Sequence, residues 1–240
     1  MTAKFSVIFE NEFVIAINKP SGLLSIPDRF IPDKENAYSL LKLSIPELFV
    51  VHRIDKETSG ILLFAKSKEV HKELNTAFEK HQVEKTYLCL TESFPRDLEG
   101  IIDKAIAHSP SQTGKMIIHP KGKESVTHYK VLDKFKNFSL VQAQPVTGRT
   151  HQIRVHMAFI GCPLACDPLY GLRTEISISD IKPRVHVSED QELRPLLQRT
   201  ALHAWKLNFK LWDKDYNLEA EIPKDLKAVL TQLKKWASIR

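Results

Sequence analysis

Hydrophobic positions along the chain group into short runs that turn residues separate, a pattern typical of β-strands and hairpins. Several of these runs are also rich in β-branched and aromatic residues, which favour strands. The strands predicted on this basis are a hairpin over Ser6–Asn18 turning at Glu10-Asn11, a buried strand over Ile61–Ala65, a strand over Thr86–Thr91, and a second hairpin of Val126–Phe135 and Phe138–Val146.

Three other segments have hydrophobic residues at helical spacing together with start or stop signals. Ser67 can cap a helix that runs to about Lys80. Thr150 can cap a helix that ends at Ile160, where Gly161 is a C-terminal stop. Pro223 can open a last helix with an amphipathic stripe.

Hairpins with a few helices between them, and no regular βαβ rhythm, predict an α+β fold built on a mixed, mainly antiparallel sheet. A chain of 240 residues can form one large domain or two small ones. We expect a single domain over residues 1–240. The segment 172–198 is polar and irregular, and we interpret it as a surface insertion.

Composition narrows the class of protein. The chain has 35 Lys and Arg against 29 Asp and Glu, a net charge of +6, which suits a polyanionic partner. The three cysteines, Cys89, Cys162 and Cys166, are too few for a disulfide framework and lack zinc-ligand spacing. The N-terminus carries charge, and the run Ile61–Ala65 is too short to cross a bilayer. We expect a cytoplasmic monomer with no metal and no membrane contact.

The first segment with candidate chemistry is HRIDKETSGILLFAKS, His52–Ser67, which places Asp55 just ahead of the Ile61–Ala65 strand. A loop anchored by a buried strand is a good platform for a catalytic carboxylate. The alternative is a charged turn in which Asp55 pairs with Lys56 or caps the turn.

The second segment is TGRTHQIRVHMAFIGCPLACDPLYG, Thr147–Gly171. It places Arg149 at the start of the predicted helix, where free N–H groups favour a phosphate. Arg154 lies one turn further on, and its planar guanidinium can bind a carboxylate in two-pronged fashion. The alternative is a helix with solvated basic residues. A third segment, Glu84–Thr91, contains Tyr87, for which a packing role is the alternative.

Together these segments resemble the pseudouridine synthase family, in its RluA-type branch. The resemblance rests on five motifs in order: INKPSGLLSIP, HRIDKETSGILLFAK, EKTYLCL, TGRTHQIRVHM…DPLYG and ALHAWKLNF. It covers residues 7–233. Two features depart from the family pattern: Ala165-Cys166 replaces the usual Gly-Asp, and the segment 172–198 is long. Both put the choice of substrate in doubt rather than the chemistry.

The resemblance implies an isomerase that converts a uridine in structured RNA, ribosomal or transfer RNA, to pseudouridine. It implies an active site in a central basic cleft, with Asp55 as the essential aspartate, Tyr87 against the target base and Arg154 paired with Asp55. It also implies a catalytic domain only, without the S4-type domain that many relatives carry. No cofactor is expected, because the reaction neither adds nor removes atoms.

A uridine inside folded RNA must be flipped out before it can react. We expect Arg53, beside Asp55, to contact the RNA and help fill the vacated position, and Arg149 and Lys66 to contact phosphates. His52 is either a further contact or a histidine satisfied within the protein, and we favour the second. The other functions considered are a non-catalytic RNA-binding protein with this fold and a hydrolase that uses Asp55.

Overall fold

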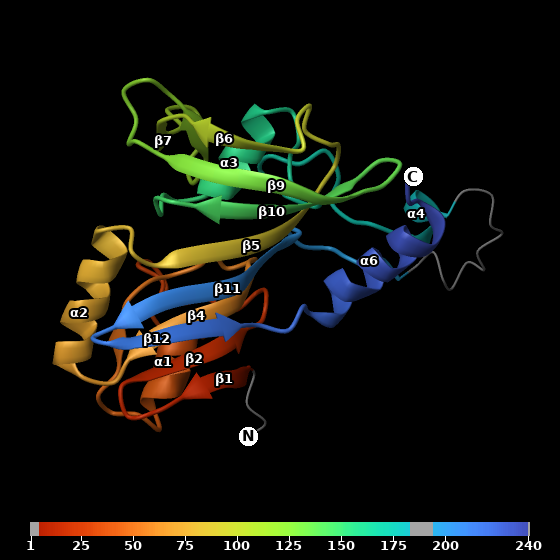
Figure 1. Cartoon of the computed structure of the whole chain (residues 1–240). Coiled ribbons are helices and arrows are strands. Elements are labelled where there is room, and N and C mark those ends of the chain that lie inside the picture. Colours follow the sequence, from red (N-terminus) through yellow and green to blue (C-terminus); the bar gives the residue numbers. More distant parts are fainter. Residues whose placement is uncertain (1–4, 183–193, 240) are drawn as a thin grey trace. The chain divides into compact units, whose positions relative to one another are not determined.

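The computed structural model describes residues 5–182 and 194–239. The chain divides into two compact units, each made from two separate stretches. The first unit contains the chain up to Thr86 and His203–Glu221, and the second contains Tyr87–Leu202 and the chain from Ile222 onward. The elements of both units are labelled in Figure 1.

The first unit consists mainly of strands. Its elements are β1 (Ser6–Glu10), β2 (Val14–Lys19), α1 (Ala37–Lys42), β3 (Phe49–Val50), β4 (Ser59–Ala65), α2 (Lys68–Glu79), β11 (Leu202–Leu211) and β12 (Lys214–Glu219). Strands β1, β2, β4 and β11 are neighbours in that order, with β12 paired to β11 and β3 paired to β4. The β11–β4 pair is parallel, and the other pairs are antiparallel.

Strand β4 is the centre of the first unit, because all seven of its residues are buried. Ile61 and Leu63 point into a core with α2, whose Val70 and Leu74 pack there. Leu62 and Phe64 alternate onto the opposite face, where they pack with α1. Helices therefore cover both faces of β4, which explains why its sequence is apolar without interruption.

The second unit is an antiparallel sheet with one long helix packed on it. Its elements are β5 (Glu84–Thr91), which begins in the first unit, β6 (Glu99–Asp103), β7 (Ile106–His108), β8 (Met116–Ile118), β9 (Val126–Lys134), β10 (Ser139–Pro145), α3 (Gln152–Phe159), α4 (Ile178–Ile181) and α6 (Lys224–Trp236). Strands β5, β10, β9 and β6 are neighbours in that order, and β7 pairs with β8 in a separate hairpin. Ile153 and Met157 of α3 pack on Cys89 and Val141 of the sheet.

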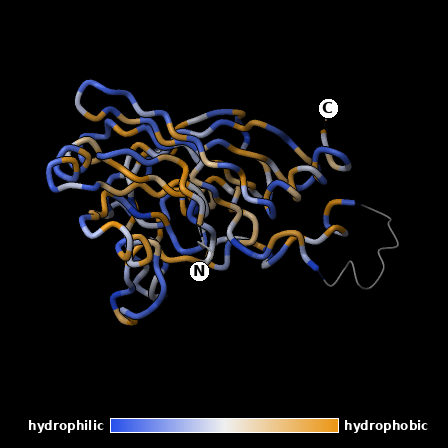
Figure 2. The backbone as a smooth tube through the Cα atoms, turned by 90° about the horizontal axis from the view of Figure 1, so that it is seen from below, coloured by the Kyte–Doolittle hydropathy of each residue, from blue (hydrophilic) through white to orange (hydrophobic). Residues whose placement is uncertain are grey.

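The hydrophobic pattern predicted most of these elements, and the α+β fold class is confirmed. Figure 2 shows hydrophobic and hydrophilic stretches following one another along the backbone. Ser67 accepts a hydrogen bond from the Val70 N–H as the cap of α2. Pro223 is the N-cap of α6, and Gly161 follows α3 with a positive φ of 79°.

The predicted insertion 172–198 is described at its two ends, and residues 183–193 lie outside the described part. The described ends contain α4 and a β-bridge between Ile176 and Leu197. The side chains of Ile176 and Leu197 are both buried. The single domain and the surface insertion stay predictions. In the part of the chain that the structure describes, no helix is both long and apolar enough to pass through a lipid bilayer.

Candidate functional site

The loop that carries Asp55, here the aspartate loop (residues 51–58), leads directly into β4. Val51 and Ile54 are buried, while Asp55 is half-buried. The Thr58 N–H donates to the Asp55 carbonyl oxygen at 3.1 Å, which closes a turn just ahead of the strand. Gly60 has a φ of 111°, and a Cβ there would collide with the backbone of Ala204. The glycine of the TSG sequence is thus required by the close approach of β11 to β4.

A buried lysine ties the aspartate loop to the segment that precedes it in the first unit. Lys19 has no exposed surface, and its ammonium group donates to the carbonyl oxygens of Pro20 (2.9 Å), Leu23 (2.7 Å) and Lys56 (3.0 Å). The Gly22 N–H also donates to the Lys56 carbonyl oxygen, at 2.9 Å. A buried cation with several carbonyl partners is a strong cross-link, because breaking any one bond leaves a polar group unsatisfied.

Ser25 makes a second link on the other side of Asp55. Its hydroxyl donates to the Ile54 carbonyl oxygen at 2.7 Å and accepts from the Ile54 N–H at 3.2 Å. The backbone on both sides of Asp55, at Ile54 and Lys56, is therefore held by the residues that follow β2. Sequence analysis quoted INKPSGLLSIP but assigned no role to Lys19 or Ser25. A lysine between an apolar strand and a proline was the available signal.

Arg53 and His52 share the aspartate loop but differ in their surroundings. The Arg53 side chain is exposed. His52 Nε2 accepts a hydrogen bond from the Leu63 N–H at 3.0 Å, and its ring stacks on Phe78 with centroids 5.1 Å apart. Burial, and after it the charge of Lys85, lowers the pKa of His52. These contacts agree with a histidine satisfied within the protein.

Lys66 lies away from Asp55. It follows the last residue of β4, and a strand of seven residues spans about 23 Å. Its ammonium group pairs with Glu10 at 2.8 Å and donates to the Asn11 carbonyl oxygen at 2.9 Å. The structure does not bring Lys66 together with Asp55, and a phosphate contact by Lys66 stays a prediction.

In the second unit, Arg154 forms a two-pronged pair with a buried carboxylate. Its Nε and Nη2 donate to Asp167 Oδ2 (2.6 Å) and Oδ1 (2.8 Å). The Asp167 side chain is fully buried, and its Oδ1 also accepts from the N–H groups of Leu169 and Tyr170. Sequence analysis anticipated the two-pronged geometry but not Asp167 as a partner. A guanidinium has five N–H groups, so one carboxylate does not exhaust what Arg154 can bind.

Tyr170 connects Arg154 with the β7–β8 hairpin. The Arg154 guanidinium lies 5.2 Å from the centroid of its ring. Its hydroxyl accepts from the Met116 N–H at 2.8 Å and lies 3.0 Å from His151 Nδ1. The end of the long signature, DPLYG, therefore supplies both the carboxylate and the aromatic ring that hold Arg154 in place.

The start of α3 differs from the prediction. The helix begins at Gln152, and its N-cap is His151, at a left-handed φ of 55° and with no side-chain cap, so Thr150 as the cap was wrong. Gln152, the first residue of the helix, binds the segment before it, because its Oε1 accepts from the Arg149 N–H (3.0 Å) and the Thr147 hydroxyl (2.7 Å). Arg149 precedes the helix and donates from Nε to the Glu124 carbonyl oxygen.

Tyr87 belongs to the same packed cluster as α3. It lies in β5 opposite Ala143 of β10 and packs, half-buried, against the core that contains Ile153 and Met157. Tyr87, Arg149 and Arg154 all belong to the second unit. Asp55, Arg53 and His52 lie on one loop of the first unit, and the pairing of Asp55 with Arg154 stays a prediction.

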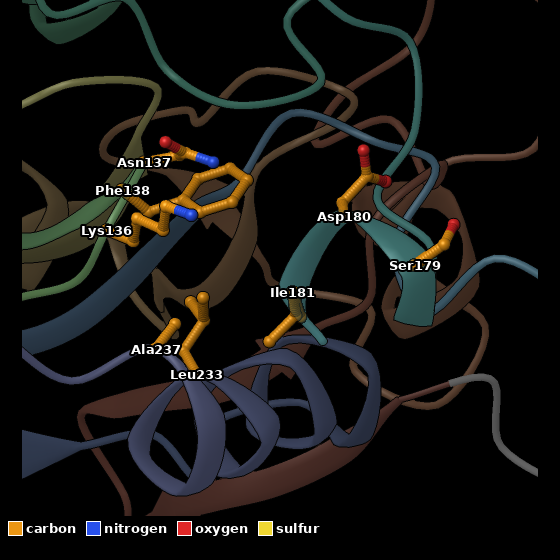
Figure 3. Close-up of a pocket in the computed structure, with 8 residues that line it drawn as sticks. All are labelled: Lys136, Asn137, Phe138, Ser179, Asp180, Ile181, Leu233 and Ala237. Atoms are coloured by element: carbon orange, nitrogen blue, oxygen red, sulfur yellow. The ribbon is translucent and has the colours of Figure 1, made fainter. Parts of the chain in front are cut away.

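A cavity of about 200 Å³ lies elsewhere in the second unit. Figure 3 shows Asp180 and Ile181 of α4 facing Phe138, the residue before β10, and Leu233 of α6 across it. None of the candidate residues lines this cavity. Within residues 5–182 and 194–239, no three His, Cys, Asp or Glu side chains are arranged to hold a metal ion.

Comparison with known proteins shows which family the chain belongs to. Residues 13–159 match the model of a family described as RNA pseudouridylate synthase. That range contains every candidate residue from Asp55 to Arg154, so the two units contribute to one family signature.

Individual relatives agree with the family match. The chain is 35% identical to ribosomal large subunit pseudouridine synthase D of Zymomonas mobilis, over 95% of this chain and 72% of that protein. It is 35% identical to the protein of the same name from Nitrosomonas europaea, over 95% of this chain and 65% of that protein. It is 34% identical to the dual-specificity RNA pseudouridine synthase RluA of Vibrio cholerae, over 76% of this chain and 75% of that protein.

Solved structures show the same fold. Human RNA pseudouridylate synthase domain containing 4 superimposes with a TM-score of 0.75 at 27% identity, over 95% of this chain and 93% of that one. Human RNA pseudouridylate synthase domain containing 1 superimposes with a TM-score of 0.71 at 22% identity, which supports the fold alone.

Proposed function

This chain belongs to the RNA pseudouridylate synthase family, and we propose that it isomerises one uridine of a structured RNA with Asp55 as the essential carboxylate. The observation that carries the proposal is that Asp55, Tyr87 and Arg154 all fall inside the matched residues 13–159. Asp55 also lies on a loop whose backbone is fixed on both sides, as a catalytic carboxylate requires.

The reaction breaks the bond between ribose C1′ and uracil N1 and joins C1′ to C5. The atoms of the substrate and the product are the same, and the hydrogen on C5 leaves as a proton while N1 gains one. Asp55 can attack the sugar carbon, attack the base, or remove a proton from C2′. All three routes need an ionised carboxylate next to the sugar and base.

Arg154 is the residue that we propose to orient Asp55 and keep it ionised. Its guanidinium is fixed by Asp167 and by the ring of Tyr170, so it cannot swing away when RNA binds. A guanidinium carries five N–H groups on more than one edge, so the same group can bind a second carboxylate while it binds Asp167.

We propose that Tyr87 and Arg53 stabilise the state in which the target uridine is flipped out of the RNA. Extrusion of a base costs a few kcal/mol, and stacking on an aromatic ring offsets about 1–3 kcal/mol of that. Tyr87 is half-buried in a strand, so its ring can stack on the base and its hydroxyl can serve proton transfer from C5. Arg53 is exposed beside Asp55 and can fill the vacated position in the RNA.

We propose large-subunit ribosomal RNA as the substrate, because two of the relatives are named ribosomal large subunit pseudouridine synthase D. Transfer RNA is the second candidate, because another relative is named a dual-specificity enzyme. A central basic cleft, phosphate contacts by Arg149 and Lys66, a monomeric state and a cytoplasmic location belong to the same proposal. We assign His52 to packing.

The test uses bulk ribosomal RNA and transfer RNA carrying tritium at uridine C5, prepared from cells that lack the gene. The wild-type protein should release tritium from ribosomal RNA, because forming the bond from C1′ to C5 frees that hydrogen. Asp55→Asn should release none while still binding the RNA. Near-normal release by Asp55→Asn would contradict the proposed role of Asp55.

The same assay separates the other functions. A non-catalytic RNA-binding protein would bind but release no tritium. A hydrolase would leave abasic ribose or cut RNA in place of a product of unchanged mass. Release from transfer RNA and not from ribosomal RNA would contradict the proposed substrate but not the reaction.

A further inference from the structure

The loop between β2 and α1 presents an exposed aromatic ring. Phe30 is 86% exposed, more than any other large hydrophobic residue among those described, and its neighbour Ile31 is 56% exposed. Exposing a phenylalanine side chain that could be buried is unfavourable by about 1.5–3 kcal/mol. Two adjacent exposed apolar side chains at the tip of one loop therefore indicate a surface that meets another molecule.

The tip of this loop has a defined conformation. Asp28 Oδ1 accepts from the N–H groups of Phe30 (2.8 Å) and Ile31 (3.1 Å), and these two bonds lower the pKa of Asp28. The Lys34 N–H donates to the Ile31 carbonyl oxygen at 3.1 Å, which forms a further turn. Pro27 and Pro32 flank the tip and restrict its backbone. A backbone held this way loses little conformational entropy on binding.

The base of the loop is joined to the aspartate loop. Ser25 contacts Ile54, the residue before Asp55, through two hydrogen bonds. The Ala37 N–H closes the loop by donating to the Leu24 carbonyl oxygen at 2.8 Å. Phe30 lies five positions after Ser25, and five residues extend at most about 18 Å. Phe30 is thus within reach of nucleotides that flank a uridine bound at Asp55.

The charges and the aromatic ring of this loop indicate which kind of ligand it can bind. The loop carries Arg29 and Lys34 against Asp28, Asp33 and Glu35, so it offers no excess of positive charge for phosphates. A nucleobase has an apolar face that stacks on an aromatic ring without a charge. Base-flipping enzymes also commonly contact the nucleotides next to the flipped one.

We propose that Phe30 is a stacking site for an unpaired nucleobase of the RNA, next to the flipped uridine. This inference rests on the proposed function, because it assumes that RNA binds at the aspartate loop. It assigns Phe30 a binding role that is independent of phosphate contacts.

The experiment measures binding of a short oligouridine, and of an RNA duplex of the same length, in an Asp55→Asn background where turnover is absent. Phe30→Ala should weaken binding of the oligouridine by about tenfold, within the range expected for stacking on one ring. Duplex binding should not change, because its bases are already stacked. The dependence of oligouridine binding on salt should keep its slope, because no phosphate contact is lost.

Matched variants separate stacking from general apolar contact. Phe30→Trp should keep the affinity, and Phe30→Leu should lose it as Phe30→Ala does. Leu43→Ala removes another apolar side chain, 85% exposed, and should have no effect. The proposal is overturned if Phe30→Ala binds the oligouridine as well as the parent, if Phe30→Leu keeps the affinity, or if duplex binding falls equally. A role in binding a protein partner would give the first of these results.

Failure of this proposal is distinct from failure of the proposed function. Tritium release by the protein with an intact Asp55 tests the reaction, whereas the binding measurements test Phe30 without any turnover. Because Phe30 makes few contacts within the protein, its variants should unfold at the same temperature as the parent.

Discussion

At the scale of single residues, Arg154 and Asp167 form a buried ion pair. The two side chains are buried and joined by bonds of 2.6 and 2.8 Å. An uncompensated buried charge is costly, whereas replacing a whole buried pair with apolar residues of similar size is often neutral. The pair is therefore better understood as a means of holding a guanidinium in place than as a source of stability.

We predict that Asp167→Ala lowers the free energy of unfolding by about 3–5 kcal/mol, because it removes one partner of a buried ion pair. The double variant Arg154→Met with Asp167→Leu should recover much of this stability and remain inactive in the tritium assay. Chemical denaturation followed by circular dichroism measures the first effect. An Asp167→Ala protein as stable as the wild type would show that the pair is not the support of Arg154.

At the scale of elements, the aspartate loop is positioned by the segment after β2 and by β4. Lys19 holds Lys56, and Ser25 holds Ile54, so Asp55 lies between two fixed points of backbone. A strand that is buried on both faces anchors the far end of the loop. Such an arrangement places a carboxylate without requiring the loop to be buried.

We predict that Lys19→Met lowers kcat by about 10–100-fold while the affinity for ribosomal RNA stays close to wild type. The physical reason is that a small displacement of a catalytic group is costly in rate but not in phosphate contacts. Loss of the ammonium group also leaves carbonyl oxygens without a donor, so the free energy of unfolding should fall by about 1–3 kcal/mol.

The control is Lys72→Met, which changes an exposed lysine on α2. It should leave kcat unchanged. Equal losses of kcat and of RNA affinity in Lys19→Met would mean that Lys19 supports the whole fold of the unit and not the position of Asp55.

At the scale of the whole molecule, histidines whose pKa is lowered in the folded state make folding sensitive to acid. Burial lowers the pKa of His52 and of His156 below their ordinary value of 6.5. His156 is fully buried between Thr127 and the Lys104 carbonyl oxygen. Below pH 6.5 the unfolded chain binds protons that the folded chain does not, so stability falls as the pH falls.

We predict that His52→Gln makes the loss of stability between pH 7 and pH 5 shallower. Glutamine keeps an acceptor for the Leu63 N–H but does not titrate. The free energy of unfolding, measured in urea across this range, gives the slope. His108→Gln changes an exposed histidine and is the matched control. Identical slopes for His52→Gln and wild type would contradict the prediction.

Local patterns in the sequence were sufficient for most of the fold. Strand and helix periodicity depend on neighbouring residues only, so β4, α2, the β9–β10 hairpin and the Ser67 cap were predictable. The candidates Asp55, Tyr87 and Arg154 came from motifs, because a family signature keeps residue types at fixed spacing.

The partners of these residues were decided only by the tertiary structure. Lys19 meets the carbonyl oxygen of Lys56 across 37 positions, Ser25 meets Ile54 across 29, and Arg154 meets Asp167 across 13. Likewise, the Gln152 side-chain amide at the start of α3 donates to Val126 and Thr127 of β9, about 25 positions earlier in the chain. Periodicity reports which face of an element is buried, whereas hydrogen-bond partners depend on which elements the folded chain places side by side.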